Sequence, residues 1–197
     1  MRVLAFTDMH GSMKAFKAVQ RKATKADIIL CCGDFTIFSH DLKKILNKFE
    51  QLKKPVLIIP GNHELGEDIQ EYCEGTKYLY FMDGGLFETD ELLILGAEGD
   101  GFSTTDSHFK KLSRKFKKLL KKSSKRYVLM THAPPFGTKH DLIIDEHCGN
   151  KPIRNFIEET QPLYAFCGHI HENQYSKDKI GKTVTVNPGP EGRLFKV

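Results

Sequence analysis

The chain has 197 residues, 40% hydrophobic and 28% charged, with a net charge of +5 that comes from ten basic residues and no acidic one between positions 110 and 126. A chain of this length can bury roughly 70% of the surface that it exposes when unfolded, so we expect a single domain, residues 1–197, that needs no disulfide. No apolar run approaches the ~20 residues that span a bilayer, and an odd number of cysteines without a C-x-x-C pair argues against a disulfide framework, so we expect a cytoplasmic protein outside the membrane.

Short apolar runs alternate with segments of helical periodicity along the chain, which predicts β-α-β units and a sheet with much parallel pairing. Apolar runs predict strands at residues 3–6, 28–32, 56–59, 92–95, 127–130 and 163–167, followed by β-rich pieces at 183–186 and 194–197. Apolar stripes predict helices over residues 42–52, 67–74, 109–120 and 152–161. The segment 96–109 has neither pattern and is a candidate functional loop.

Metal-capable side chains follow five of the predicted strands. The segments after these strands read TDMHG, GDFT, PGNHE, THAPP and GHIHE. In open α/β sheets, ligands bind outside the carboxyl ends of the strands, so we expect these segments to meet at one rim although they are far apart in sequence. The candidate site residues are Asp8, His10, Asp34, Asn62, His63, Glu64, His132, His169 and His171.

Seven of these side chains together have the composition of a metal centre. One such motif alone is more often a turn than a ligand, but the set supplies three oxygen and four imidazole donors. That number is too large for one metal with an open position and suits two divalent ions, for which Mn, Fe, Zn, Ni and Co are all compatible. The expected metal ligands are Asp8, His10, Asp34, Asn62, His132, His169 and His171, with Asp34 as the natural bridge because a carboxylate has two oxygens.

The ordered series D-x-H, G-D, G-N-H-E, a lone histidine after a strand, and G-H-x-H resembles the calcineurin-like metallophosphoesterases, in particular their small single-domain phosphodiesterase-like members. The series is intact over Asp8 to His171. The resemblance implies an α/β fold in which a two-sheet β sandwich is flanked by α-helices. It also implies that one metal is held by Asp8, His10 and His171 and the other by Asn62, His132 and His169, with Asp34 between them.

The chemistry of such a centre explains the remaining residues of the PGNHE segment. Two divalent ions against two aspartates leave the site positive, which attracts a phosphate ester, and a water between the ions can lose a proton and attack the phosphorus. Asn62 can ligate without adding negative charge. The resemblance implies that His63 is not a ligand but faces the leaving group or a phosphate oxygen, with Glu64 or another acid holding its ring protonated or oriented. We therefore expect Asp34, Asn62 and His63 to be the catalytic residues.

The remaining histidines and three loop phenylalanines are explained more simply by a structural role than by a role at the site. Among the remaining histidines, His108 and His140 are the strongest candidates for a role at the site, but an exposed or locally bonded ring is the simpler expectation. Phe35, Phe38 and Phe136 lie in loops that could wall a base or aryl group, although packing over the core is the simpler expectation.

The sequence as a whole predicts a dinuclear-metal phosphohydrolase of a small phosphodiester or nucleotide-like ester. A nuclease or a phosphomonoesterase on the same site is the alternative, and a non-catalytic phosphate-binding module is a third reading, against which the intact ligand set speaks. The expected partner is a small phosphate ester, not a membrane. Nucleic acid is not favoured, because the basic segment 110–126 has an apolar stripe and no interleaved aromatics, which is typical of a solvated helix face. The oligomeric state stays open.

Overall fold

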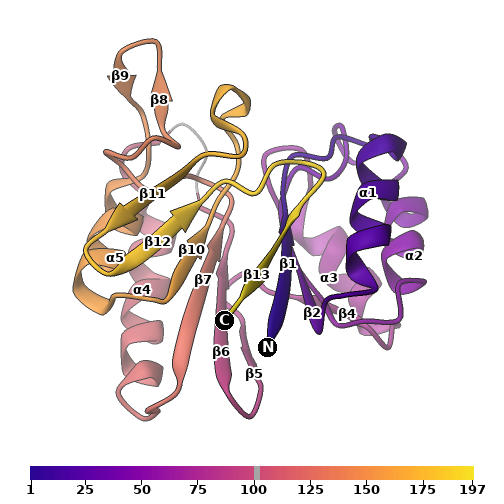
Figure 1. Cartoon of the computed structure of the whole chain (residues 1–197), viewed down its shortest axis with the longest axis horizontal. Helices are drawn as coiled ribbons and strands as arrows, with labels where there is room; N and C mark the ends of the chain where they lie inside the picture. The colour runs from indigo at the N-terminus through magenta and orange to yellow at the C-terminus, as the bar shows by residue number, and fades with distance from the viewer. Residues whose placement is uncertain (100–102) are drawn as a thin grey trace.

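The computed structural model describes residues 1–99 and 103–197, in which two large β-sheets pack face to face with helices on both outer sides (Figure 1). The first sheet has the order β13-β1-β2-β3-β4, and its strands are parallel except for β13. Its strands are β1 (Arg2–Phe6), β2 (Ile28–Cys32), β3 (Val56–Ile59), β4 (Leu79–Phe81) and β13 (Arg193–Lys196).

The second sheet has the order β11-β12-β10-β7-β6-β5, with four parallel strands in the middle and an antiparallel strand at each edge. Its strands are β5 (Leu86–Glu88), β6 (Leu92–Ala97), β7 (Arg126–Thr131), β10 (Tyr164–Phe166), β11 (Lys177–Ile180) and β12 (Thr183–Val186). A small hairpin of β8 (Leu142–Ile143) and β9 (Glu146–His147) projects from the upper edge in Figure 1.

The helices form the two outer layers. The first sheet is covered by α1 (Met13–Ala23), α2 (Leu42–Glu50) and α3 (Gly66–Glu74), and the second by α4 (Ser107–Leu120) and α5 (Lys151–Thr160) (Figure 1). A short 3-10 helix, His171–Asn173, follows β10. The predicted two-sheet sandwich flanked by helices is thus confirmed.

Alternation along the strands divides the core into three layers. In β2, Ile28, Leu30 and Cys32 pack between the sheets, whereas Ile29 and Cys31 pack under α1 and α2. Because successive side chains of a strand point to opposite faces, a strand that is buried on both faces needs an unbroken apolar run. This is why these strands could be read from the sequence, and it places the adjacent cysteines in different layers as buried hydrophobes.

The structure corrects several predicted boundaries. Helix α1 was not predicted, nor were the short strands β4, β5 and β11. The basic segment 110–126 is not one helix, because α4 ends at Leu120 and Arg126 begins β7. The predicted loop 96–109 is shorter, since Ala97 still belongs to β6 and Ser107 begins α4; residues 100–102 of it lie outside the described part. No helix among the described residues has the length and apolar character needed to span a bilayer.

Candidate active site

The candidate residues converge where the carboxyl ends of both sheets meet, at the upper edge in Figure 1. Asp8 and His10 follow β1, and Asp34 follows β2. From the second sheet, His132 follows β7 and His169 follows β10. The backbone N–H of His169 donates to both carboxylate oxygens of Asp8, at 3.0 and 3.1 Å, which joins the two sheets directly at the site.

The potential ligand atoms fall into two groups that meet at Asp34. Within each group all atoms lie within 4.8 Å of one another. Asp34 Oδ2 lies 3.3 Å from His132 Nε2 and 3.9 Å from His10 Nε2, so this carboxylate stands between the groups. The first group is Asp8, His10 and His171, and the second is Asp34, His132 and His169.

Hydrogen bonds to the outer ring nitrogens orient two of these histidines as ligands. His132 Nδ1 donates to the carbonyl of Cys32 at 2.8 Å, and His10 Nδ1 donates to the carbonyl of Thr36 at 3.1 Å. In the neutral rings each Nε2 therefore carries a lone pair. His10 Nε2 lies 2.9 Å from His171 Nε2, and the buried His132 Nε2 forms no hydrogen bond within the described chain. Ring nitrogens this close repel each other unless a proton or a cation lies between them, and a set of imidazole and carboxylate donors fits divalent metals.

The pKa values show how strongly the site favours a positive charge. Burial alone would lower the pKa of His132, but Asp34 outweighs burial and raises it to about 9. In return, His132 holds the pKa of Asp34 well below its usual range, although burial opposes this. Burial, together with the charge on His132, lowers the pKa of His169 to about 4. Asp34 and Asp8 therefore favour a positive charge at His132, which agrees with a centre that holds cations.

The backbone at the site adopts a conformation that non-glycine residues rarely accept. The φ angles of Asp8, His10, Asp34 and His169 are 52°, 44°, 51° and 75°. Such residues cost on the order of 1 kcal/mol each and persist only where surrounding contacts hold them, typically at functional sites. Close packing also explains one motif glycine: a Cβ at Gly168 would lie 1.9 Å from Thr7 Oγ1 and 2.8 Å from Asp8 Oδ2, so a side chain there would clash with the segment that carries Asp8.

Glu64 was predicted to hold the ring of His63, but its carboxylate contacts other groups. Its Oε2 accepts hydrogen bonds from the backbone N–H of Asp34 at 2.9 Å and of Gly61 at 3.0 Å. Its Oε1 accepts from the N–H and the hydroxyl of Thr36, at 2.8 and 2.7 Å. The buried carboxylate therefore clamps the GDFT segment to the PGNHE turn, and His63 is not among its hydrogen-bond donors.

His63 is held by its own set of contacts. Its N–H donates to Asp34 Oδ1 at 2.9 Å, and its Nδ1 accepts from the N–H of Phe38 at 3.2 Å. Because Nδ1 accepts from a backbone donor, the neutral ring carries its proton on Nε2 and can donate it. One His63 ring nitrogen lies within 4.8 Å of ligand atoms of His10 and Asp34. Asn62, which precedes His63 in the turn, is exposed.

A third cluster at the same edge contains His108, which the sequence marked as a candidate, together with Asp83 and Glu98, which it did not. His108 Nε2 lies 3.1 Å from Asp83 Oδ2, and Asp83 Oδ1 accepts from the N–H of Glu98 at 3.0 Å. Together with Asn62, Glu98 and His108 line a depression of 300 Å³. Glu98 directly follows β6, so the rule that polar side chains after a strand gather at this edge could have found it.

Of the remaining candidates, His140 and Phe35 lie in the interior and Phe38 lies on the surface. His140 is buried and structural, bonded to Ser176 Oγ at 2.5 Å and to Thr185 Oγ1 at 2.9 Å. Phe35 is fully buried, as the simpler expectation had it, but Phe38 is 80% exposed and was placed wrongly by that expectation.

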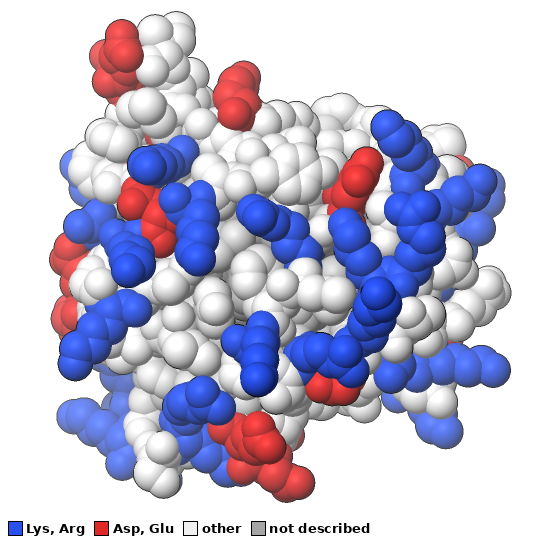
Figure 2. All heavy atoms as spheres, in the orientation of Figure 1, with Lys and Arg blue, Asp and Glu red and all other residues white. Residues whose placement is uncertain are grey.

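The basic residues are not confined to the segment 110–126 that the sequence emphasised. On α4, Lys115 donates to the carbonyl of Gly84 at 2.7 Å and Lys117 pairs with Glu159. Figure 2 shows a second band of Lys and Arg side chains over α1, whose sequence MKAFKAVQRKA contains no acid. Positive charge therefore lies on both outer helix layers.

Comparisons with known proteins agree with this geometry. The family model described as calcineurin-like phosphoesterase matches residues 1–173. An uncharacterized protein of Methanocaldococcus jannaschii is 32% identical over 97% of this chain and 89% of that protein. A probable glycerophosphodiester phosphodiesterase of Arcobacter nitrofigilis is 25% identical over 75% of this chain and 57% of that protein. A dimetal phosphatase from Danio rerio has the same fold, with a TM-score of 0.65 at 10% identity over 96% of this chain and 89% of that one.

The family match extends over both groups of candidate ligands, up to and beyond His171. The two-sheet architecture and the motif order agree with it. The chain belongs to the calcineurin-like phosphoesterase family and is a hydrolase acting on phosphate esters.

Proposed function

We propose that the protein is a two-metal phosphodiesterase that cleaves a small phosphodiester or nucleotide-like ester. The observation that carries the proposal is the sharing of Asp34 Oδ2 between two groups of imidazole and carboxylate donors, 3.3 Å from one histidine and 3.9 Å from another. One ion would be held by Asp8, His10 and His171 and the other by His132 and His169, with Asp34 between them. Asn62, the amide of the PGNHE turn, would complete the second set. When bound, two divalent ions attract the phosphate group and activate a water for attack.

The protein's own residues supply orientation and a hydrogen-bond donor. Outer hydrogen bonds from His10 and His132 fix these rings so that Nε2 faces the ions. Glu64 keeps Asp34 and the PGNHE turn in register through its four hydrogen bonds. His63, with its proton on Nε2, is placed to donate a hydrogen bond to the departing alkoxide oxygen or to a phosphate oxygen. Asp34 would thus contribute to holding both ions, and His63 would stabilise charge on the ester.

The choice of a diester over a monoester is supported by the phosphodiesterase name of the Arcobacter nitrofigilis relative. A nuclease would need a path of basic side chains that leads from the site along the bound nucleic-acid strand. The basic helices α1 and α4 lie on the two outer layers instead. A small ester therefore fits the site better than a polymer.

The proposal is tested with purified protein stripped of metal by a chelator and then supplied separately with Mn, Fe, Zn, Ni or Co. Activity is measured on a chromogenic diester, the matching monoester, cyclic nucleotides and an oligonucleotide. We expect no activity without metal and the highest kcat/KM on a small diester or nucleotide ester. Full activity after exhaustive chelation, or a clear preference for the monoester or the oligonucleotide, would contradict the proposal.

A further inference from the structure

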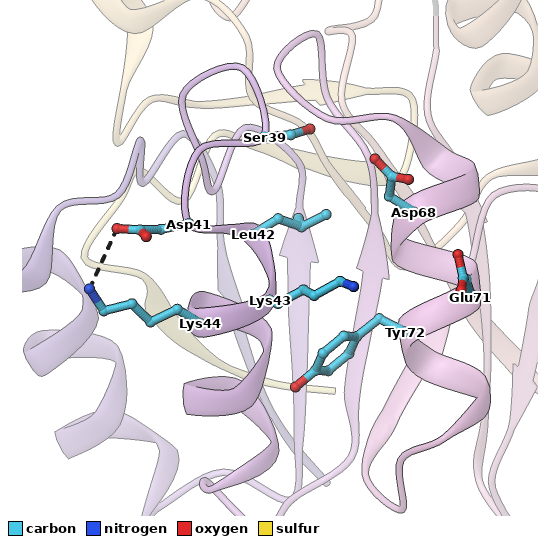
Figure 3. Close-up of a pocket in the computed structure, with 8 residues that line it drawn as sticks. All are labelled: Ser39, Asp41, Leu42, Lys43, Lys44, Asp68, Glu71 and Tyr72. Carbon is cyan, nitrogen blue, oxygen red and sulfur yellow. Dashed lines mark ion pairs between the residues drawn. The ribbon is translucent and has the colours of Figure 1, made fainter.

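A cavity of 590 Å³ opens directly beside the candidate metal centre, with His10 in its wall. This size lies within the roughly 300–1,000 Å³ of small-molecule sites. A larger cavity of 720 Å³ between α2 and α3 contains none of the candidate ligands, and the acids Asp41, Asp68 and Glu71 outnumber the two lysines that line it (Figure 3). The cavity beside His10 is therefore the place for the rest of the substrate.

The most unusual residue of this cavity is Phe38. Its side chain is 80% exposed although its backbone is firmly held, with φ at 47°. Its N–H donates to His63 Nδ1 at 3.2 Å, and the N–H of Ser39 donates to the carbonyl of His63 at 2.8 Å. The two ring centroids, of Phe38 and His63, lie 4.4 Å apart. A strained, anchored loop that presents an aromatic ring to solvent beside the reacting group has the features of a ligand platform.

Two further apolar side chains continue this surface. Ile37 is 50% exposed and Met13, at the start of α1, is 43% exposed, and both line the same cavity. Isolated exposed apolar residues are ordinary, but adjoining ones in a cavity next to a charged centre indicate a binding surface.

Two lysines and one aspartate, Asp41, are the charged residues that line the cavity. Lys44 and Lys48 of α2 both line it. Lys44 pairs with Asp41 at 3.5 Å, whereas Lys48 forms no ion pair in the described chain and lies 5.7 Å from the ring of Phe16. Lys43 points the other way, toward α3, as Figure 3 shows. One ammonium group, that of Lys48, is thus available to a second anion.

We propose that this cavity binds the organic part of the ester: a planar aromatic group such as a nucleobase lies against Phe38, and a second anionic group of the same molecule lies at Lys48. The inference rests on the proposed function and narrows its substrate class to nucleotide esters that carry an additional phosphate. Ile37 and Met13 form the sides of the aromatic site, and His63 is shared between this site and the reacting phosphate.

The test measures binding of three product-like probes to the zinc-loaded protein by calorimetry: methyl phosphate, adenosine 5′-monophosphate and adenosine 3′,5′-bisphosphate. We expect the monophosphate to bind on the order of 10-fold more tightly than methyl phosphate, as base stacking on an aromatic ring provides. The second phosphate should add roughly 5-fold, the upper range of an exposed ion pair. The methyl NMR signals of Met13 and Ile37 should shift with the adenosine probes and not with methyl phosphate.

Four variants, one of them a matched control, assign these gains to residues. Phe38→Ala should remove most of the preference for the monophosphate over methyl phosphate, and Phe38→Tyr should keep it because the ring remains. Lys48→Ala should remove the gain from the second phosphate, while the matched control Lys43→Ala should keep it.

The outcomes separate the two proposals. If methyl phosphate does not bind, the proposed function fails and this inference fails with it. If methyl phosphate binds but the adenosine probes gain nothing, or if Phe38→Ala weakens all three probes equally, the inference is overturned while the proposed function stands.

Discussion

Replacing Glu64 with glutamine tests the structural role that we assign to its carboxylate. The amide has nearly the same size but only one oxygen, so it cannot accept all four hydrogen bonds. In the better orientation the amide nitrogen faces Thr36, whose hydroxyl can turn to accept but whose N–H loses its acceptor. That buried N–H costs about 1–3 kcal/mol, and loss of charge assistance weakens the two remaining bonds by about 0.5–1 kcal/mol each.

The sum predicts that Glu64→Gln lowers the free energy of unfolding by about 3 kcal/mol. Urea denaturation of the metal-free protein measures this value without interference from bound ions. Glu67→Gln is the matched control, because Glu67 is exposed one turn further along the chain. If both variants lose the same small amount of stability, the clamp assigned to Glu64 is wrong. An effect only on turnover of esters with poor leaving groups would instead support the original expectation that Glu64 orients His63.

Three further predictions follow from the site and its surroundings. Burial lowers the pKa of His140 to about 4, so between about pH 6.5 and pH 4 this residue binds more protons in the unfolded chain than in the folded one. Through His140, lowering the pH from 7 to 5 should reduce the free energy of unfolding, measured by urea denaturation, by about 2 kcal/mol, and His140→Gln should lose that part of the pH dependence. His63→Ala should keep its bound metal and lose about 10²- to 10⁴-fold in kcat on an alkyl or nucleoside ester but much less on a nitrophenyl ester; an equal loss on both would leave only phosphate-oxygen stabilisation, and a loss of metal would make His63 a ligand. Turnover of a small chromogenic diester should stay within a few fold when the charges are removed from Lys117, Lys118, Lys121 and Lys122; a collapse in a folded variant would show that these lysines serve the site.

The placement of the site could be predicted from the sequence because it follows from the strands. Runs such as residues 28–32 are apolar throughout, so their ends are visible, and parallel strands bring the residues after them to one edge. Short edge strands lack this signal. β11, with the sequence KDKI, is polar because it lies at the edge of its sheet, and its charges conceal its pairing.

Side-chain roles that depend on contacts across the fold could not be predicted. Glu64 stands next to His63 in sequence, yet its acceptor oxygens reach Thr36, 28 residues away in sequence. Phe38 was expected in the core because an exposed phenylalanine is unfavourable, and only the contacts with His63 explain its position. Helix α1 was missed because alanines supply much of its buried face, which weakens the apolar stripe.

The number of metal ions bound per chain tests the central claim most directly. Elemental analysis after loading with one divalent metal and dialysis should give two ions per chain in the unchanged protein. In Asp34→Asn, which lacks the carboxylate between the two groups, it should give one or none, with loss of most activity. One ion per chain in the unchanged protein, or two ions with full activity in Asp34→Asn, would contradict a dinuclear centre built around Asp34.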